Sequence, residues 1–257
     1  MKKLWITSLD GDDKKVQTLM ETAKTYALEA SGHFWLDDLE NLGWLGPRTE
    51  LIKDDVAVWV IISSETTLAS TSMRYGLSLL AVSVQAVRGH GFPIILLHDG
   101  PVPSIESLPT PLQGAEVLAF DNPSLGAKIV AKANIPARQV PVDYRLDIHA
   151  MPRLGVWFEV GPVEESWKGV LLGVCDGAID AHGVGPRGTL PEKALLEYPL
   201  QGMKLNIGEK DYTAWAVHNQ LDVNSSYFVR IQGDPASLLF GPLAEGDEAE
   251  VFMMNVK

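Results

Sequence analysis

Hydroxyl, acidic and imidazole side chains gather where four short apolar segments of the chain end. They are Ser8 and Asp10, Asp37, Ser63, Ser64 and Glu65, and His98 and Asp99. A carboxylate binds a pair of ribose hydroxyls well, because both hydroxyls can donate to its two oxygens. We therefore take this set as candidate binding residues for a small polar ligand, with a nucleotide or an NAD-like molecule as the class that fits.

The apolar segments themselves predict strands of a parallel sheet. They are Leu4–Ser8, His33–Leu36, Val56–Ile62 and Pro93–Leu97, with Ala115–Phe120 as a fifth. The unbroken run VAVWVII at 56–62 is typical of a strand buried on both faces, as parallel sheets require. Helical periodicity at 14–30 and 68–88 places helices between strands, which predicts right-handed crossovers and a doubly wound sheet. Ligands of such sheets bind beyond the carboxyl ends of the strands, so the candidate residues should share one rim.

The second half of the chain has a different pattern. Apolar and polar residues alternate after Val140, as at Tyr144, Leu146 and Ile148, and turns that contain Gly and Pro separate the segments. Short alternating segments of this kind predict an antiparallel sandwich or barrel. We therefore predict a parallel α/β domain at 1–125, a linker at 126–139 and an all-β domain at 140–257.

Charge and composition exclude several classes of partner. The 257 residues carry a formal net charge of −12, which repels phosphate backbones and anionic lipids, so nucleic acid and membrane surfaces are not expected as partners. Cys175 is the single cysteine, which excludes a disulfide framework and favours a reducing, cytoplasmic location. The histidines lack a metal-ligand spacing and no phosphate-binding glycine motif is present, so the sequence predicts no metal and no cofactor.

Several features in order resemble a Toll/interleukin-1 receptor (TIR)-type domain over about residues 1–100. The first strand ends at Ser8 and opens into an acidic loop, and HFWLDD at 33–38 resembles the aromatic-Leu/Tyr-Asp segment of that family. ELIKDDVAVWVIISS at 50–64 resembles its short helix, Asp, apolar strand and Ser-rich end, and PIILLHD at 93–99 completes the match. The resemblance implies a flavodoxin/TIR-like parallel fold, in the wider group of nucleoside deoxyribosyltransferase-like folds.

The glutamate that makes such domains NAD-cleaving enzymes is missing from this chain. In the family it stands in the helix after the third strand, and the equivalent segment here is STSMRYGL at 70–77, with Gly76 at that position. Glu65, just past the third strand, is the nearby carboxylate and our candidate for a replacement catalytic residue. Arg74 could hold a phosphate through its planar guanidinium, or pair with an acid.

Three functions are consistent with these observations. The first is a catalytically silent TIR-like signalling or assembly module that senses a nucleotide and can self-associate. The second is cleavage of the N-glycosidic bond of NAD or a nucleoside, with Glu65 as the carboxylate. The third is carbohydrate or peptide binding through the β domain, which carries Trp157, Trp167 and Trp215. The structural alternative to all three is that the acids and serines are turn and cap residues.

Overall fold

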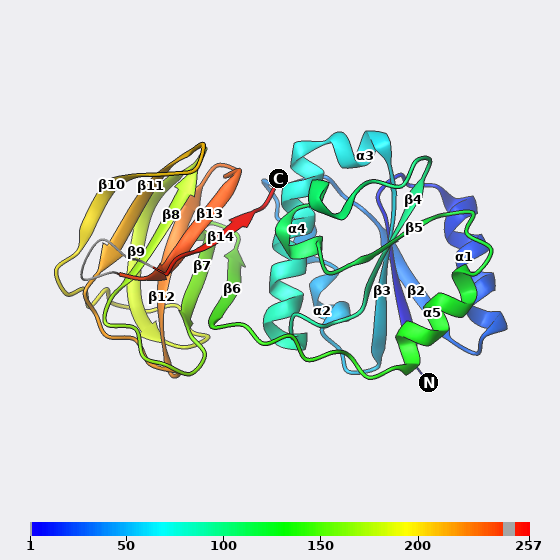
Figure 1. Cartoon of the computed structure of the whole chain (residues 1–257), viewed down its shortest axis with the longest axis horizontal. Helices are drawn as coiled ribbons and strands as arrows, with labels where there is room; N and C mark the ends of the chain where they lie inside the picture. Colours follow the sequence, from blue (N-terminus) through cyan, green and yellow to red (C-terminus); the bar gives the residue numbers. More distant parts are fainter. Residues whose placement is uncertain (1, 244–249) are drawn as a thin grey trace. The chain divides into compact units, whose positions relative to one another are not determined.

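The computed structural model describes residues 2–243 and 250–257 and divides the chain into two compact units (Figure 1). The first is Met1–Val140 and the second is Pro141–Lys257. A parallel α/β unit followed by a unit of antiparallel sheets is therefore confirmed. None of the helices in the described residues is long and apolar enough to cross a membrane.

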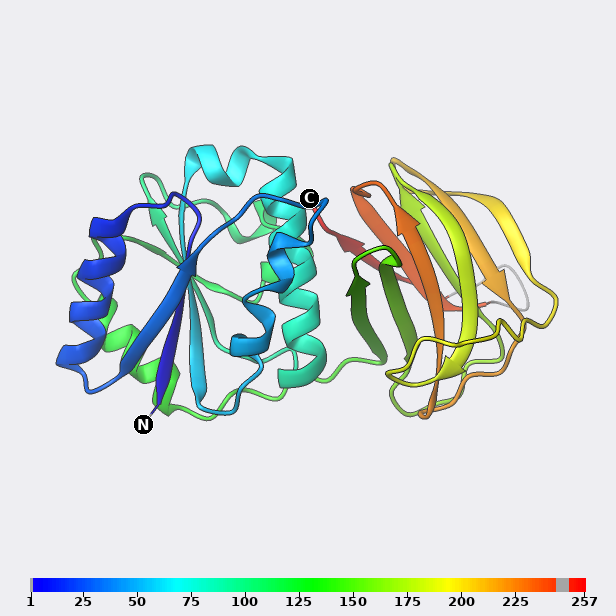
Figure 2. The same ribbon diagram turned by 180° about the vertical axis from the view of Figure 1, so that it is seen from behind.

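The first unit is a five-stranded parallel sheet with the strand order β2-β1-β3-β4-β5. Its strands are β1 (Lys3–Ser8), β2 (Glu29–Phe34), β3 (Val56–Ser64), β4 (Ile94–Asp99) and β5 (Glu116–Ala119). Its helices are α1 (Asp13–Thr25), α2 (Arg48–Leu51), α3 (Glu65–Ala69), α4 (Thr71–Arg88) and α5 (Leu125–Asn134), with 3-10 turns η1 (Gly43–Leu45), η2 (Ile105–Ser107) and η3 (Thr110–Leu112). Winding reverses between β1 and β3, so helices cover both faces. Figure 2 shows α1 and α5 on one face and α4 with α2 on the other.

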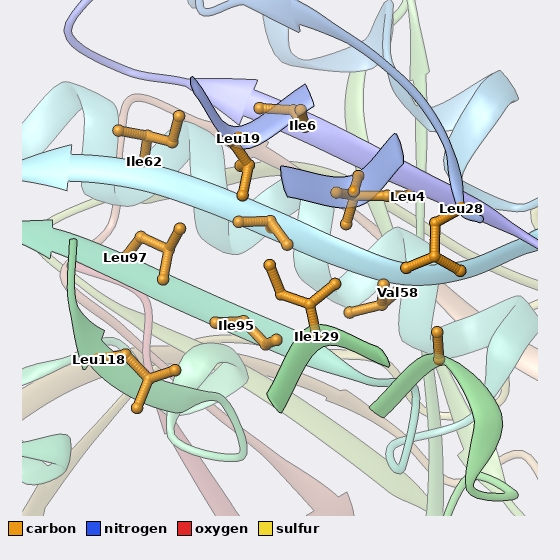
Figure 3. Close-up of a cluster of buried hydrophobic side chains, with 13 residues drawn as sticks. Leu4, Ile6, Leu19, Leu28, Val58, Ile62, Ile95, Leu97, Leu118 and Ile129 are labelled. Carbon is orange, nitrogen blue, oxygen red and sulfur yellow. The ribbon is translucent and has the colours of Figure 1, made fainter. Parts of the chain in front are cut away.

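The core of this unit lies between the middle strands and the helices α1 and α5 (Figure 3). Leu4 and Ile6 of β1 and Val60 of β3 are almost fully buried there, with Leu19 of α1 and Ile129 of α5 packed against them. Burying each such side chain contributes roughly 1.5–3 kcal/mol. This core fixes the strand register, and with it the set of side chains that reach the rim.

Three elements differ from the sequence prediction. The helix predicted at 68–88 is divided at Ser70, whose extended backbone separates α3 from α4. The first helix ends at Thr25 rather than Ala30, because Ala27 adopts a left-handed φ of 56° that an α-helix cannot contain. The following strand consequently begins at Glu29 and ends at Phe34. The predicted linker at 126–139 is a third correction, because it contains most of α5, whose buried Ile129 places it inside the first unit.

The second unit consists of two antiparallel sheets, with strand orders β10-β11-β8-β13-β14 and β6-β7-β12-β9. Its strands are β6 (Tyr144–Met151), β7 (Gly155–Pro162), β8 (Val170–Cys175), β9 (Ala178–Pro186), β10 (Leu200–Ile207), β11 (Lys210–Val217), β12 (Ser225–Gln232), β13 (Ser237–Pro242) and β14 (Phe252–Asn255). Of the alternating residues predicted to face the core, Leu146 and Ile148 are buried and Tyr144 is half-buried. The sequence pattern is consistent with either a sandwich or a barrel, and both of these are antiparallel. The described strands of this unit form two antiparallel sheets.

Candidate functional site

The candidate residues do meet at one rim of the parallel sheet, but the alternation of the strands divides them into two groups. Ser8, Ser64 and Asp99 lie on the α1 side, because each is an even number of residues from the core positions Ile6, Ile62 and Leu97. Ser63 and His98 follow the opposite parity and therefore lie on the α4 side. The two groups have different chemistry.

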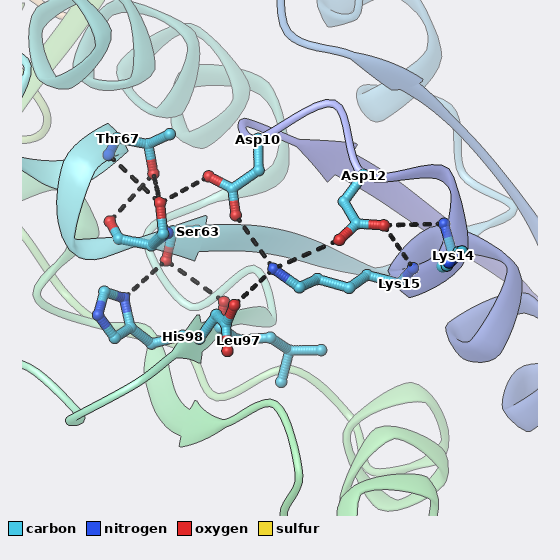
Figure 4. Close-up of polar contacts among 10 residues, drawn as sticks. Asp10, Asp12, Lys14, Lys15, Ser63, Thr67, Leu97 and His98 are labelled. Carbon is cyan, nitrogen blue, oxygen red and sulfur yellow. Dashed lines mark hydrogen bonds and ion pairs between the residues drawn. The ribbon is translucent and has the colours of Figure 1, made fainter.

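A lysine joins the acidic group on the α1 side (Figure 4). The Lys15 ammonium donates a 2.7 Å hydrogen bond to Asp99 and lies 3.6 Å from Asp10 and 3.7 Å from Asp12. Ser64 Oγ donates to the other oxygen of Asp10 at 2.7 Å. The hydrogen bond to Asp99 is the main reason why the pKa of Lys15 is raised. One ammonium group thus serves three carboxylates, and the acidic group is partly neutralised within the protein.

Lys15 was not among the sequence candidates, although it stands in the first turn of the helix that follows the acidic loop. Asp12 caps that helix, since its carboxylate accepts from the backbone N–H groups of Lys14 and Lys15. This cap sets the start of α1 and so directs Lys15 back toward the rim. The sequence signal for the start of this helix was the change from Asp13 to Lys14. That signal does not reveal that the Lys15 side chain contacts Asp99 of β4.

The α4 side of the rim holds a cavity of about 450 Å³. Three of the candidates line it, namely Glu65, Arg74 and His98, together with apolar and backbone groups at 101–103 and 107–108. Ser63 lies next to His98, and its hydroxyl is 3.2 Å from His98 Nδ1 (Figure 4). The same hydroxyl donates a 3.3 Å hydrogen bond to the Leu97 carbonyl. An acid, a base and a guanidinium therefore surround a space large enough for a small ligand.

Arg74 is bonded to the backbone rather than to a carboxylate in the described structure. Its guanidinium donates to the Ser107 carbonyl at 2.7 Å and to the Leu68 carbonyl at 3.4 Å. Burial lowers its pKa, but an arginine remains charged at neutral pH. Arg74 thus ties the wall of the cavity to α4 and also brings positive charge to it.

Glu65 stands at the first position of α3 and is exposed. Ser64 caps this helix, and Thr67 completes a reciprocal capping box with it. A carboxylate in the first turn of a helix is favoured by the helix dipole, which gives Glu65 a structural role whether or not it has a chemical one. Asp37 lies apart from both groups, because its carboxylate accepts a 2.6 Å hydrogen bond from Ser72 at the start of α4.

Ser8 is fully buried, and its hydroxyl has no hydrogen-bond partner among the described residues. It lies at the end of β1 between β2 and β3. Ser8 is also not among the residues that line the cavity on the α4 side.

Gly76 has no room for a side chain. A Cβ atom at this position would lie 2.8 Å from the ring of Trp35 and 3.3 Å from Leu39. A glutamate there would require Trp35 to move. The space that a side chain at position 76 would need is therefore filled by the indole of Trp35.

Trp35 belongs to a layer of aromatic and polar side chains between the sheet and α4. His33 lies between Trp5 and Trp35, with ring centroids 5.8 and 6.3 Å away. The indole nitrogens of both tryptophans and both ring nitrogens of His33 are buried without hydrogen-bond partners among the described residues. Burial lowers the pKa of His33 to about 4, so this imidazole is neutral at pH 7.

Comparison with known proteins adds little to this geometry. No family model matches the chain, and no curated protein matches it. Among solved structures, the crystal structure of an NAD kinase from Archaeoglobus fulgidus in complex with ATP is similar at 12% identity, over 92% of each chain. The TM-score is 0.31, which is too low to support an argument about fold or ligand.

The contact between position 76 and Trp35 can be tested with a double-mutant cycle. Alanine is a better helix former than glycine by about 1 kcal/mol. Despite this, we expect Gly76→Ala to lower the free energy of unfolding by about 1–3 kcal/mol, because the methyl group overpacks against the indole. In a Trp35→Ala background the same change should stabilise the protein. Urea unfolding of the four proteins measures both effects, and stabilisation by Gly76→Ala in the unmodified background would contradict the contact.

The buried imidazole predicts a pH dependence of stability. Because the pKa of His33 falls from 6.5 to about 4 on folding, the unfolded chain binds more protons between these values. Stability should be fullest above pH 6.5 and fall as the pH drops toward 4, by about 3 kcal/mol in total. His33→Gln should remove this component from urea unfolding curves measured across the range. The exposed His218 is the control, and an equal effect of His218→Gln would refute the assignment.

Proposed function

We propose that the first unit is a catalytically silent TIR-like module that binds a nucleotide-type ligand at its rim and acts in signalling or assembly. The observation that carries the proposal is the packing of Trp35 against Gly76, at the position where the enzymatic domains have their glutamate. The strand order β2-β1-β3-β4-β5 is compatible with this family resemblance and supports it.

The cavity on the α4 side supports a ligand of this class. Glu65 offers two acceptor oxygens to a ribose diol, and Arg74 provides positive charge for a phosphate. His98, which is 3% exposed, offers an aromatic face and a ring nitrogen at the base of the space. The acids on the α1 side contribute less, because Lys15 and Ser64 already bond to them.

Assembly is supported by the edge of the sheet. Strand β2 stands at the end of the strand order, so its outer edge is available for pairing. Two large apolar side chains near the end of this strand are exposed, Phe34 of β2 by 48% and Leu36, two residues beyond it, by 63%. Adjacent exposed apolar residues at an open strand edge favour association with a second chain.

The second candidate function is N-glycosidic cleavage by Glu65, and the position of this residue in the wall of the cavity favours it. Its exposure counts against a perturbed, catalytic carboxylate, since activated groups are commonly desolvated. Binding of carbohydrate by the β unit has less support. Trp167 is 7% exposed, and the Trp215 ring packs edge-on against His182 at 4.7 Å.

Incubation of the full chain with NAD and a mixture of nucleosides separates the first two functions. We expect no release of nicotinamide or free base, because the cavity lacks a desolvated carboxylate, and mass-resolved chromatography measures this. Release that is lost in Glu65→Ala and retained in Glu106→Ala would establish the second function instead. Glu106 is the matched control because it is an exposed glutamate close to the same cavity.

Light scattering over a range of protein concentrations tests assembly. We expect the mass to increase with concentration, and the double change of Phe34→Ser with Leu36→Ser to restore the mass of a monomer by removing the apolar edge. Val102 is 47% exposed and lies on another loop, so Val102→Ser should leave the association unchanged. A protein that stays monomeric at every concentration would contradict assembly through β2.

A further inference from the structure

The second unit carries a cluster of metal-ligating side chains on the polar face of its four-stranded sheet. Asp147 and His149 of β6 are two residues apart, so they lie on the same face. Glu159 of β7 is the direct cross-strand partner of Asp147. One potential ligand atom from each of the three lies within 4.8 Å of the others.

Glu159 is held in place from two directions. It is 3% exposed, and its Oε1 accepts a 2.6 Å hydrogen bond from Ser226 Oγ and a 2.9 Å hydrogen bond from the Gly188 N–H. Its Oε2 lies 2.6 Å from His149 Nε2. One carboxylate oxygen is therefore fixed by the surrounding protein, and the other faces the imidazole. Ligating carboxylates in metal sites are commonly oriented by outer hydrogen bonds in this way.

The charge of the cluster favours a cation. Two carboxylates that face each other across neighbouring strands repel, and a positive charge between them offsets that cost. Arg145 comes within 3.7 Å of Glu159, but on the Oε1 side. Its guanidinium is committed to the carbonyls of Pro162 and Ser225 and to the Ser226 hydroxyl. The guanidinium therefore acts on Oε1, while Oε2 lies beside His149 and close to Asp147, the other two potential ligands.

We propose that Asp147, His149 and Glu159 bind one divalent transition-metal ion of the Zn²⁺ or Mn²⁺ type. One imidazole with two carboxylates is a donor set that suits such ions. Ligand atoms on one ion lie about 3 Å or more apart, so His149 Nε2 and Glu159 Oε2 separate slightly and the ion replaces the proton between them. The His149 side chain is 21% exposed and is therefore partly accessible to an ion from solvent.

The ion would join β6, which carries Asp147 and His149, to β7, which carries Glu159. Glu159 is bonded to Ser226 at the start of β12 and to Gly188 in the loop after β9, so the hydrogen bonds around the ion reach both segments. Spacing along the sequence does not reveal the site, because its ligands come from two strands whose register is visible only in the folded sheet. This accounts for the absence of a metal from the sequence prediction.

Metal titration of the full chain tests the proposal. After treatment with a chelator and dialysis, the protein is titrated with ZnCl₂ and with MnCl₂ by calorimetry, and thermal unfolding is followed with and without each ion. We expect one ion per chain and a higher melting temperature with metal, since an ion that binds the folded state stabilises it. Ser226→Ala should weaken binding by roughly 10–100-fold through the orientation of Glu159.

His149→Ala and Asp147→Asn decide the assignment, because both residues are partly exposed and their replacement should leave the fold intact, as circular dichroism checks. Each should weaken binding at least as much as Ser226→Ala. Asp180→Asn is the matched control, since Asp180 lies on the same sheet and bonds to Arg230 instead. Absence of binding by either ion, or binding that survives both His149→Ala and Asp147→Asn, would overturn the proposal.

Discussion

The parallel pairing of β3 between β1 and β4 is the constraint on which the rest of the first unit depends. Residues 58–62 of β3 are fully buried, so the strand can exist only with helices on both faces of the sheet. Parallel pairing also directs the three strand ends to the same edge. The candidate residues meet there for this reason and without any local signal of their own.

Alternation along those strands then determines the chemistry of each side of the rim. Ser64 and Asp99 fall on the side where Lys15 arrives, and the acids become internal partners of an ammonium group. Ser63 and His98 fall on the other side, next to a cavity. The fold therefore gives acids on one half of the rim an internal ammonium partner and places the other half beside a cavity.

Sequence patterns were sufficient for β1, β3, β4 and β5 of the parallel sheet and for the change of architecture near Val140, because both depend on local periodicity. They failed where one residue or a distant contact decides. A left-handed Ala27 shortens α1, and the packing of Ile129 makes α5 part of the first unit. Neither effect can be read from composition.

Part of the candidate site was also predictable. The rim follows from the fold class, but the role of Lys15 depends on a side chain that reaches from α1 to Asp99. The glycine at 76 was visible in the sequence, whereas the indole of Trp35 that packs against it was not. The cluster of Asp147 and Glu159 needed the register between two strands, which no spacing within one strand contains.

The most direct test of the account is to map where a nucleotide-type ligand binds. Amide chemical shifts of the full chain are measured as AMP, ADP-ribose or NAD is added. The account predicts that the largest changes occur at Glu65, His98 and Ser107, which line the cavity on the α4 side of the rim. No change with any of these ligands, or changes confined to Pro141–Lys257, would contradict a ligand site in the first unit.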